Sequence, residues 1–92
     1  MELQQYDELT FENIKHIDEN GVEFWYAREL QTILEYMEWR NFNQVIDKAK
    51  IACENSGKRV VANFVDVNKT VQLNFGTREI ADIKLSRYAC YL

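Results

Sequence analysis

The most reactive side chains in this 92-residue chain belong to a single histidine and two cysteines. His16 is followed by the acidic residues Asp18 and Glu19, but no serine or cysteine stands near it in the sequence. A catalytic nucleophile needs a base within hydrogen-bond reach, and the spacing gives no sign that His16 activates Cys53. Two cysteines are too few for a disulfide scaffold or a four-cysteine zinc site. Cys53 and Cys90 each have apolar neighbours, so we predict that both are small core residues.

Motifs that would support an enzyme are missing from the sequence. No HExxH, CxxC or EF-hand spacing is present, and the three glycines are too far apart to form a phosphate-binding loop. Pairs of carboxylates do occur, but fifteen acidic residues make such pairs expected by chance. We therefore expect a protein that is not an enzyme, with no catalytic residues, no metal site and no cofactor.

A helix predicted over residues 39–55 carries the pattern that best fits nucleic-acid recognition. Its apolar residues follow the helical period and form one stripe: Trp39, Phe42, Val45, Ile46, Ala49, Ala52 and Cys53. Its polar side presents Arg40, Asn41, Gln44 and Lys48 within about 100° of arc. Arginine can bind guanine through two hydrogen bonds, asparagine and glutamine can bind adenine, and lysine suits phosphate.

Lys58 and Arg59 would extend this polar surface past the end of the helix. Every amphipathic helix has a polar face, so a solvated face with ordinary charges explains the same residues. The aromatic run Phe24-Trp25-Tyr26 is similarly open to two interpretations. Its rings could stack on exposed bases, or alternate members could point into the core of a strand, which is the interpretation we favour.

The composition is that of an ordinary globular domain, with 47% hydrophobic and 28% charged residues. Such values argue against intrinsic disorder, and no apolar run reaches the ~18–20 residues that a membrane helix needs. The first residues show no signal peptide. We expect a cytoplasmic protein that does not interact with a membrane.

Charge is divided unevenly along the chain, whose net charge is −4. Residues 1–39 hold two basic and ten acidic side chains, whereas residues 40–92 hold nine basic and five acidic ones. The basic second half would suit a polyanion such as DNA. Two ordinary solvated faces would produce the same division.

The expected elements alternate between helix and strand. We predict a helix over 10–17 capped by Thr10, a turn over 18–21, a strand over 22–27 and a helix over 27–34. After the helix over 39–55, which Gly57 closes, strands or extended loops are predicted over 60–65 and 70–75, a turn at Gly76, and an alternating segment over 77–85. Ser86 then caps a final helix. That helix runs to the last residue without a capping signal, which suggests the N-terminal fragment of a longer protein.

Several blocks of the sequence resemble a known family. They are EFWYARELQ at 23–31, LEY at 34–36, WRNF at 39–42 and LSRYACYL at 85–92, and the opening FENIKHIDENG at 11–21 fits as well. The chain is similar to the DNA-damage-inducible protein D family and to the wider BRO-N (baculovirus repeated-ORF, N-terminal) family, a domain that phage antirepressors share. The resemblance implies one small α+β domain over residues 1–92, with about four helices and a short antiparallel sheet or hairpins.

The resemblance also implies a non-catalytic DNA-binding domain of a DNA-damage-inducible (SOS-type) or prophage-derived regulatory protein. Arg28, Arg40, Asn41 and Arg87 lie within the matching blocks. Together with the helix pattern they give the predicted DNA-binding set: Arg28, Arg40, Asn41, Gln44, Lys48, Lys58, Arg59 and Arg87. Single- and double-stranded DNA both remain open as the partner, as does a homodimer.

An alternative function belongs to a different class. The acidic first 39 residues could bind a basic protein partner, so that the domain modulates recombination or repair proteins. Side chains such as Glu29, Glu35 and Glu38 would then carry the interaction.

Overall fold

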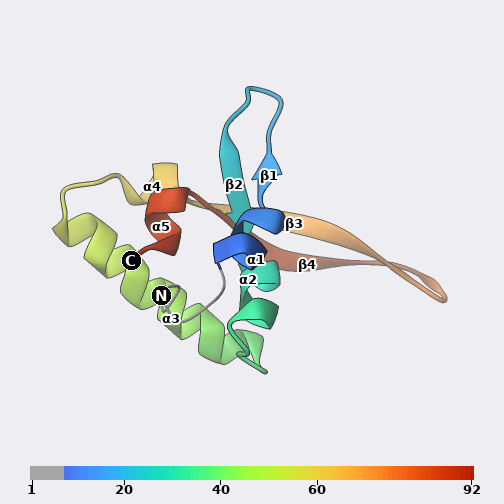
Figure 1. Cartoon of the computed structure of the whole chain (residues 1–92). Helices are drawn as coiled ribbons and strands as arrows, with labels where there is room; N and C mark the ends of the chain where they lie inside the picture. Colours follow the sequence, from blue (N-terminus) through green and yellow to red (C-terminus); the bar gives the residue numbers. More distant parts are fainter. Residues whose placement is uncertain (1–7) are drawn as a thin grey trace.

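Two β-hairpins and a long helix dominate the computed structural model, which describes residues 8–92 (Figure 1). Within those residues the elements are α1 (Glu8–Asn13), β1 (His16–Ile17), β2 (Glu23–Tyr26), α2 (Ala27–Ile33), α3 (Trp39–Asn55), α4 (Val60–Asn63), β3 (Phe64–Leu73), β4 (Gly76–Leu85) and α5 (Arg87–Cys90). The fold is α+β, as predicted, with five helices in the described part rather than about four.

The four strands form one antiparallel sheet in the order β1-β2-β4-β3. β2 joins β4 through only two residue pairs, Trp25 with Leu85 and Tyr26 with Lys84. β3 and β4 pair over ten positions, from Phe64 opposite Leu85 to Leu73 opposite Gly76. Because β2 and β4 share so few pairs, the two hairpins leave the body in different directions (Figure 1).

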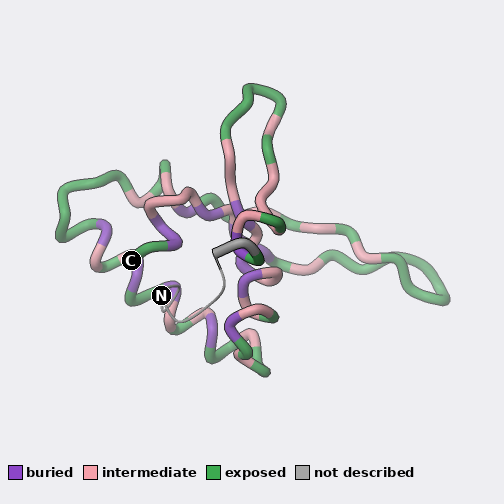
Figure 2. Tube along the Cα trace, viewed as in Figure 1, coloured by how far each residue is buried: buried purple, intermediate pink, exposed green. Residues whose placement is uncertain are grey.

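The core lies where α3, β2, the last residues of β4 and α5 meet, which is where Figure 2 shows most of the buried trace. Trp25 is fully buried, and its ring stacks on Phe11 with centroids 4.3 Å apart. Its indole nitrogen donates a hydrogen bond of 2.9 Å to the Phe11 carbonyl. This contact fixes α1 on the sheet and satisfies the one polar atom of the buried ring.

The alternation predicted for the aromatic run is confirmed. Trp25 points into the core, while its neighbours Phe24 and Tyr26 are half-buried on the other face of β2. There they pack around His16, whose ring centroid lies 5.4 Å from Phe24 and 4.8 Å from Tyr26. Core packing, rather than base stacking, thus accounts for Trp25. The prediction that Cys53 and Cys90 are core residues is likewise confirmed, since both are 0% exposed.

The predicted ends of α3 are confirmed. The Gly57 amide donates to the Glu54 carbonyl and the Lys58 amide to the Cys53 carbonyl, with Gly57 at φ +77°. This is the Schellman ending, in which a left-handed residue follows the helix. The end of α2 has the same hydrogen-bond pattern but places Glu35 at φ +62°, where glycine would be free of strain.

The start of α2 is capped from a distant part of the chain. Its N-cap residue Tyr26 has no side chain that can accept a hydrogen bond from the first turn. The carboxylate of Asp82, in β4, accepts instead from the Arg28 amide at 3.1 Å and from the Ile83 amide at 2.8 Å. Asp82 therefore ties the root of the β3–β4 hairpin to α2.

Two sequence predictions were wrong. The helix predicted over 10–17 ends at Asn13, with Thr10 inside it, and His16 and Ile17 pair with β2 instead. Ile17 matched the helical spacing, but it is 60% exposed and belongs to no core stripe.

The segment 60–65 was predicted as extended but begins with the one-turn helix α4. Asn63 stabilises that turn through its side chain. Its Nδ2 donates to the Arg59 carbonyl at 2.8 Å, and its Oδ1 accepts from the Ser86 hydroxyl at 2.6 Å. Beyond it, β3 is one continuous strand rather than two short segments. The Ser86 cap on the last helix is confirmed, since its hydroxyl accepts from the Ala89 amide at 3.0 Å.

Candidate nucleic-acid interface

The exposed face of α3 brings four of the predicted DNA-binding residues together. Phe42, Ile46, Ala49 and Cys53 are buried on one side of the helix. On the other side Arg40, Asn41, Gln44 and Lys48 are all exposed. At about 1.5 Å per residue, the 17 residues of α3 present a rod roughly 25 Å long. The amphipathic arrangement inferred from the sequence is therefore the observed one.

Acidic residues border this face on one edge. Asp47 and Glu54 are also exposed, and at about 100° per residue they lie roughly 20° and 40° beyond Arg40, away from the lysine. Arg40 itself is 82% exposed and lies 3.7 Å from Glu38, just before the helix. The edge that carries Asn41 and Lys48 is thus the more favourable side for an anionic partner.

Lys58 and Arg59 continue the surface beyond the C-terminal end of α3. Both are exposed, in the turn between α3 and α4. In the described part of the chain, neither they nor Lys48 form an ion pair. Their charges are therefore directed to solvent and available to a phosphate backbone.

Arg28 is placed differently, because the fold already uses its side chain. Its guanidinium donates from Nε to the Ala81 carbonyl at 2.6 Å and lies 4.2 Å above the Trp39 ring. It thereby links α2 to β4 and to the first residue of α3. The Arg28 side chain therefore lies next to the exposed face of α3, but contacts within the fold hold it there.

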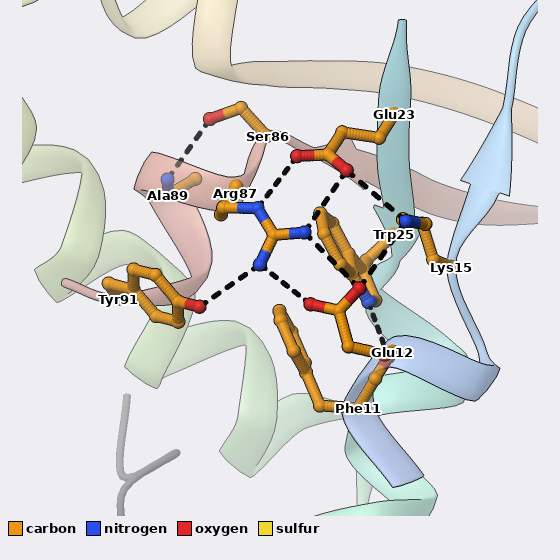
Figure 3. Close-up of polar contacts among 9 residues, drawn as sticks. All are labelled: Phe11, Glu12, Lys15, Glu23, Trp25, Ser86, Arg87, Ala89 and Tyr91. Carbon is orange, nitrogen blue, oxygen red and sulfur yellow. Dashed lines mark hydrogen bonds and ion pairs between the residues drawn. The ribbon is translucent and has the colours of Figure 1, made fainter. Parts of the chain in front are cut away.

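Arg87 lies in a dense ionic cluster with residues of α1 and β2 (Figure 3). Its guanidinium donates to Glu23 at 2.6 Å and to Glu12 at 2.7 Å, and it reaches the Tyr91 hydroxyl at 3.2 Å. Lys15 adds contacts of 3.3 Å to Glu12 and 3.5 Å to Glu23. The cluster therefore joins α1, β2 and α5 across most of the sequence.

The electrostatics of the cluster follow from these contacts. Hydrogen bonds from Arg87 hold the pKa values of Glu12 and Glu23 below their ordinary value, and the same bonds raise the pKa of Arg87. The guanidinium also lies 5.1 Å from the centre of the Trp25 ring, above the core. With its donors directed at protein acceptors, Arg87 is a fold-stabilising residue here, and sequence reasoning could not separate it from the exposed arginines.

The acidic first half of the chain is partly neutralised by such contacts. Besides Glu12 and Glu23, Glu29 contacts His16 at 2.6 Å. Of the acidic residues named for a protein partner, Glu35 and Glu38 remain exposed, and Met37 between them is 95% exposed.

An open pocket of about 310 Å³ separates the start of α3 from the root of the β3–β4 hairpin. Trp39 and Asn43 line one side of it, and residues 66–68 and 81–83 line the other. The buried Asp82 carboxylate on this lining lies 2.7 Å from the Lys69 ammonium group, which also lies 3.4 Å above the Tyr26 ring. The charge of Asp82 is therefore balanced within the fold, although the ammonium is not aligned for a regular hydrogen bond to Oδ2.

Among residues 8–92 no three histidine, cysteine or acidic side chains are grouped so as to hold a metal ion. Burial raises the pKa of the Cys90 thiol, which favours its unreactive protonated form. None of the helices in that same stretch is long and apolar enough to cross a bilayer.

Comparison with known proteins gives two matches. Residues 13–92 match the family described as "BRO family, N-terminal domain". The chain is also 47% identical over 83 residues to DNA damage-inducible protein D of Escherichia coli strain K12, an alignment that covers 89% of this chain. It spans only 30% of the length of that relative. No solved structure matches the chain.

Proposed function

This chain belongs to the BRO family, whose N-terminal domain it matches, and from that membership we propose that it is a DNA-binding domain. We further propose that it serves a regulatory protein of the bacterial DNA-damage (SOS-type) response or of prophage origin, without catalytic activity. Its similarity to a protein named DNA damage-inducible protein D supports the regulatory context. We propose a cytoplasmic location.

The observation that carries the proposal is the exposed face of α3. Arg40, Asn41, Gln44 and Lys48 project from a helix whose opposite side is anchored in the core, so the protein presents them on a rigid element. Their chemistry covers both phosphate contact and base-edge contact. The exposed Lys58 and Arg59 add phosphate-binding capacity at the end of the same helix.

Fluorescence anisotropy with labelled single- and double-stranded DNA between ~50 and 200 mM salt tests the proposal, because phosphate-dominated binding weakens steeply over that range. We expect the double charge reversal R40E/K48E to abolish most of the binding. We also expect K48Q to lower the slope of log K against log salt by about 0.9 on duplex DNA, the effect of losing one phosphate contact.

Asn20→Asp is the matched control for K48Q. It changes the net charge by the same amount, but it lies in the β1–β2 turn, away from α3. Binding by R40E/K48E that equals wild-type binding would show that α3 is not the contact surface. Failure of the wild-type chain to bind either form of DNA at the lowest salt would contradict the DNA-binding function itself.

A second candidate function, a domain that modulates recombination or repair proteins, is favoured by the loop between α2 and α3. There the fully exposed Met37 stands between the exposed acids Glu35 and Glu38, a combination suited to a basic protein partner. Under this function E35Q/E38Q would abolish a pull-down interaction that K48Q leaves intact. A pull-down that is insensitive to E35Q/E38Q would count against it.

A further inference from the structure

The β3–β4 hairpin extends beyond the body as a two-stranded ribbon. Burial ends near its root, at Phe64 in β3 and at Asp82, Ile83 and Leu85 in β4, and every residue between 65 and 81 is half-buried or exposed. Figure 2 shows the far end of the ribbon exposed. Ten residues per strand at about 3.3 Å each give a length near 33 Å, which accounts for the 45 Å long axis of the molecule.

The two faces of this ribbon differ in chemistry. The strand register places Val65, Val67, Lys69, Val71 and Leu73 on one face, together with Arg78, Ile80, Asp82 and Lys84 from β4. We call this the apolar ribbon face. The other face begins at the root with the buried Phe64, Ile83 and Leu85. Further out, apart from Ala81, it is polar: Asp66, Asn68, Thr70, Gln72, Thr77 and Glu79. Such alternation is typical of a sheet with one covered face, yet no described element covers the outer half of the apolar ribbon face.

Charge on the ribbon identifies the kind of molecule that could cover this face. Its basic residues are Lys69, Arg78 and Lys84, and its one acid, Asp82, is buried at the root. The exposed acids Asp66 and Glu79 lie on the opposite face. Lys69 is already paired with Asp82, so Arg78 and Lys84 carry the excess positive charge of this face. A second copy packed face to face would bring these like charges together, whereas a phosphate backbone complements them.

The tip of the ribbon adds an apolar side chain that the fold leaves unused. Phe75, in the turn between the strands, is completely exposed, and Leu73 beside it is 51% exposed. Phenylalanine and leucine are among the side chains that proteins insert between base steps to unstack and bend duplex DNA. Two-stranded ribbons are also among the elements by which proteins bind DNA, in the major or the minor groove.

We infer that the β3–β4 ribbon is an arm that lies in a groove of duplex DNA, with its basic apolar face on the duplex and Phe75 inserted at a base step. This inference rests on the proposed DNA-binding function and specifies the form of DNA as a deformable duplex. It assigns the arm the role of bending the DNA, and it leaves to α3 the larger share of the phosphate contacts.

The experiment uses the whole chain and a duplex with a fluorescent donor and acceptor at its ends, so that bending is read as energy transfer. We expect the wild type to bend the duplex by tens of degrees. Phe75→Ser should abolish most of the bending and weaken binding by about tenfold, the effect of losing one stacking contact. Ile17→Ser is the control, since it removes an exposed apolar side chain in β1, outside both the ribbon and α3, and it should change neither quantity.

The outcomes separate the arm from the function. If Phe75→Ser bends the duplex as much as the wild type does, the inference about the arm is overturned. If R40E/K48E still loses binding in that case, the DNA-binding function is retained without the arm. If Phe75→Ser instead converts a dimer into a monomer in sedimentation, with unchanged bending, a second copy occupies the ribbon and the inference is wrong. A wild type that binds no DNA overturns both.

Discussion

The Arg87 cluster and the outer β3–β4 ribbon use the same residue types in opposite ways. In the cluster, Arg87 meets two carboxylates and a tyrosine hydroxyl above the buried Trp25. In the ribbon, Arg78 and Phe75 are exposed and meet no ionic or aromatic partner within the described residues. A cation and an aromatic ring thus stabilise the fold in one region and face solvent in the other. The difference depends on whether distant segments supply partners.

The contrast predicts that aromatic substitutions will lower the free energy of unfolding strongly in the body and hardly at all in the ribbon. Trp25→Ala should show the largest effect. Removing a fully buried tryptophan leaves a cavity and ends the stack on Phe11, so we expect a loss of about 3–5 kcal/mol in the free energy of unfolding. Urea denaturation followed by far-ultraviolet circular dichroism measures it. A loss below ~1 kcal/mol would mean that this region does not stabilise the fold as described.

The root of the ribbon should behave like the body rather than like the tip. Asp82→Ala removes the acceptor of the Arg28 and Ile83 amides and the partner of the Lys69 ammonium group, so we expect a loss of about 1–3 kcal/mol. The same denaturation experiment on Glu79→Ala, an exposed acid further along β4, provides the control and should stay within about 0.5 kcal/mol. Equal effects of the two changes would remove the distinction between root and tip.

The Arg87 cluster should make the stability of the body depend on pH. The pKa values of Glu12 and Glu23 are lower in the folded state than their ordinary value of 4.5. The stabilisation they provide is therefore complete above about pH 4.5 and is lost as the pH falls through the folded-state pKa values.

In Arg87→Gln the two carboxyl groups lose their main hydrogen-bond donor and keep only Lys15, so their protonation would destabilise the folded state less. We expect urea midpoints between pH 7 and pH 3 to fall more steeply for the wild type than for this variant. Parallel curves would show that the cluster contributes little to stability.

The smallest effect on stability is expected at the tip of the ribbon. Phe75→Ser changes a side chain that makes no core contact, so the free energy of unfolding should stay within about 0.5 kcal/mol of the wild-type value. Thermal denaturation checks this expectation. A large loss in the free energy of unfolding would show that Phe75 stabilises the fold as Trp25 does, and the difference between the two regions would not hold.

Local patterns predicted the two longest helices, α2 and α3, well. The stripe of α3 and its glycine ending gave both ends of that helix. The alternation of β2 predicted that alternate aromatic residues are buried, and the structure adds that the buried one is Trp25. The prediction failed where the structure depends on distant partners. His16 and Ile17 became a strand because β2 lies beside them, and α4 formed because Asn63 contacts Ser86.

The candidate site shows the same limit. The exposed face of α3 could be derived from helical periodicity alone, because burial of one side fixes exposure of the other. The different roles of Arg87 and Arg40 could not be derived in this way. They depend on Glu12 and Glu23, which lie 75 and 64 residues before Arg87 in the sequence. The ribbon was missed because its strand was interpreted as two short segments, which hid the common face of Val67 and Val71.

The large sequence separation between Arg87 and its partners also determines when the ionic cluster can form during synthesis of the chain. Sixty-four residues separate Glu23 from Arg87, and a ribosome adds about 5–20 residues per second. Roughly 3–13 seconds therefore pass in which α1 and β2 have been synthesised but their closing arginine has not. During that interval the aromatic surface of Trp25 lacks the guanidinium that lies above it in the finished fold.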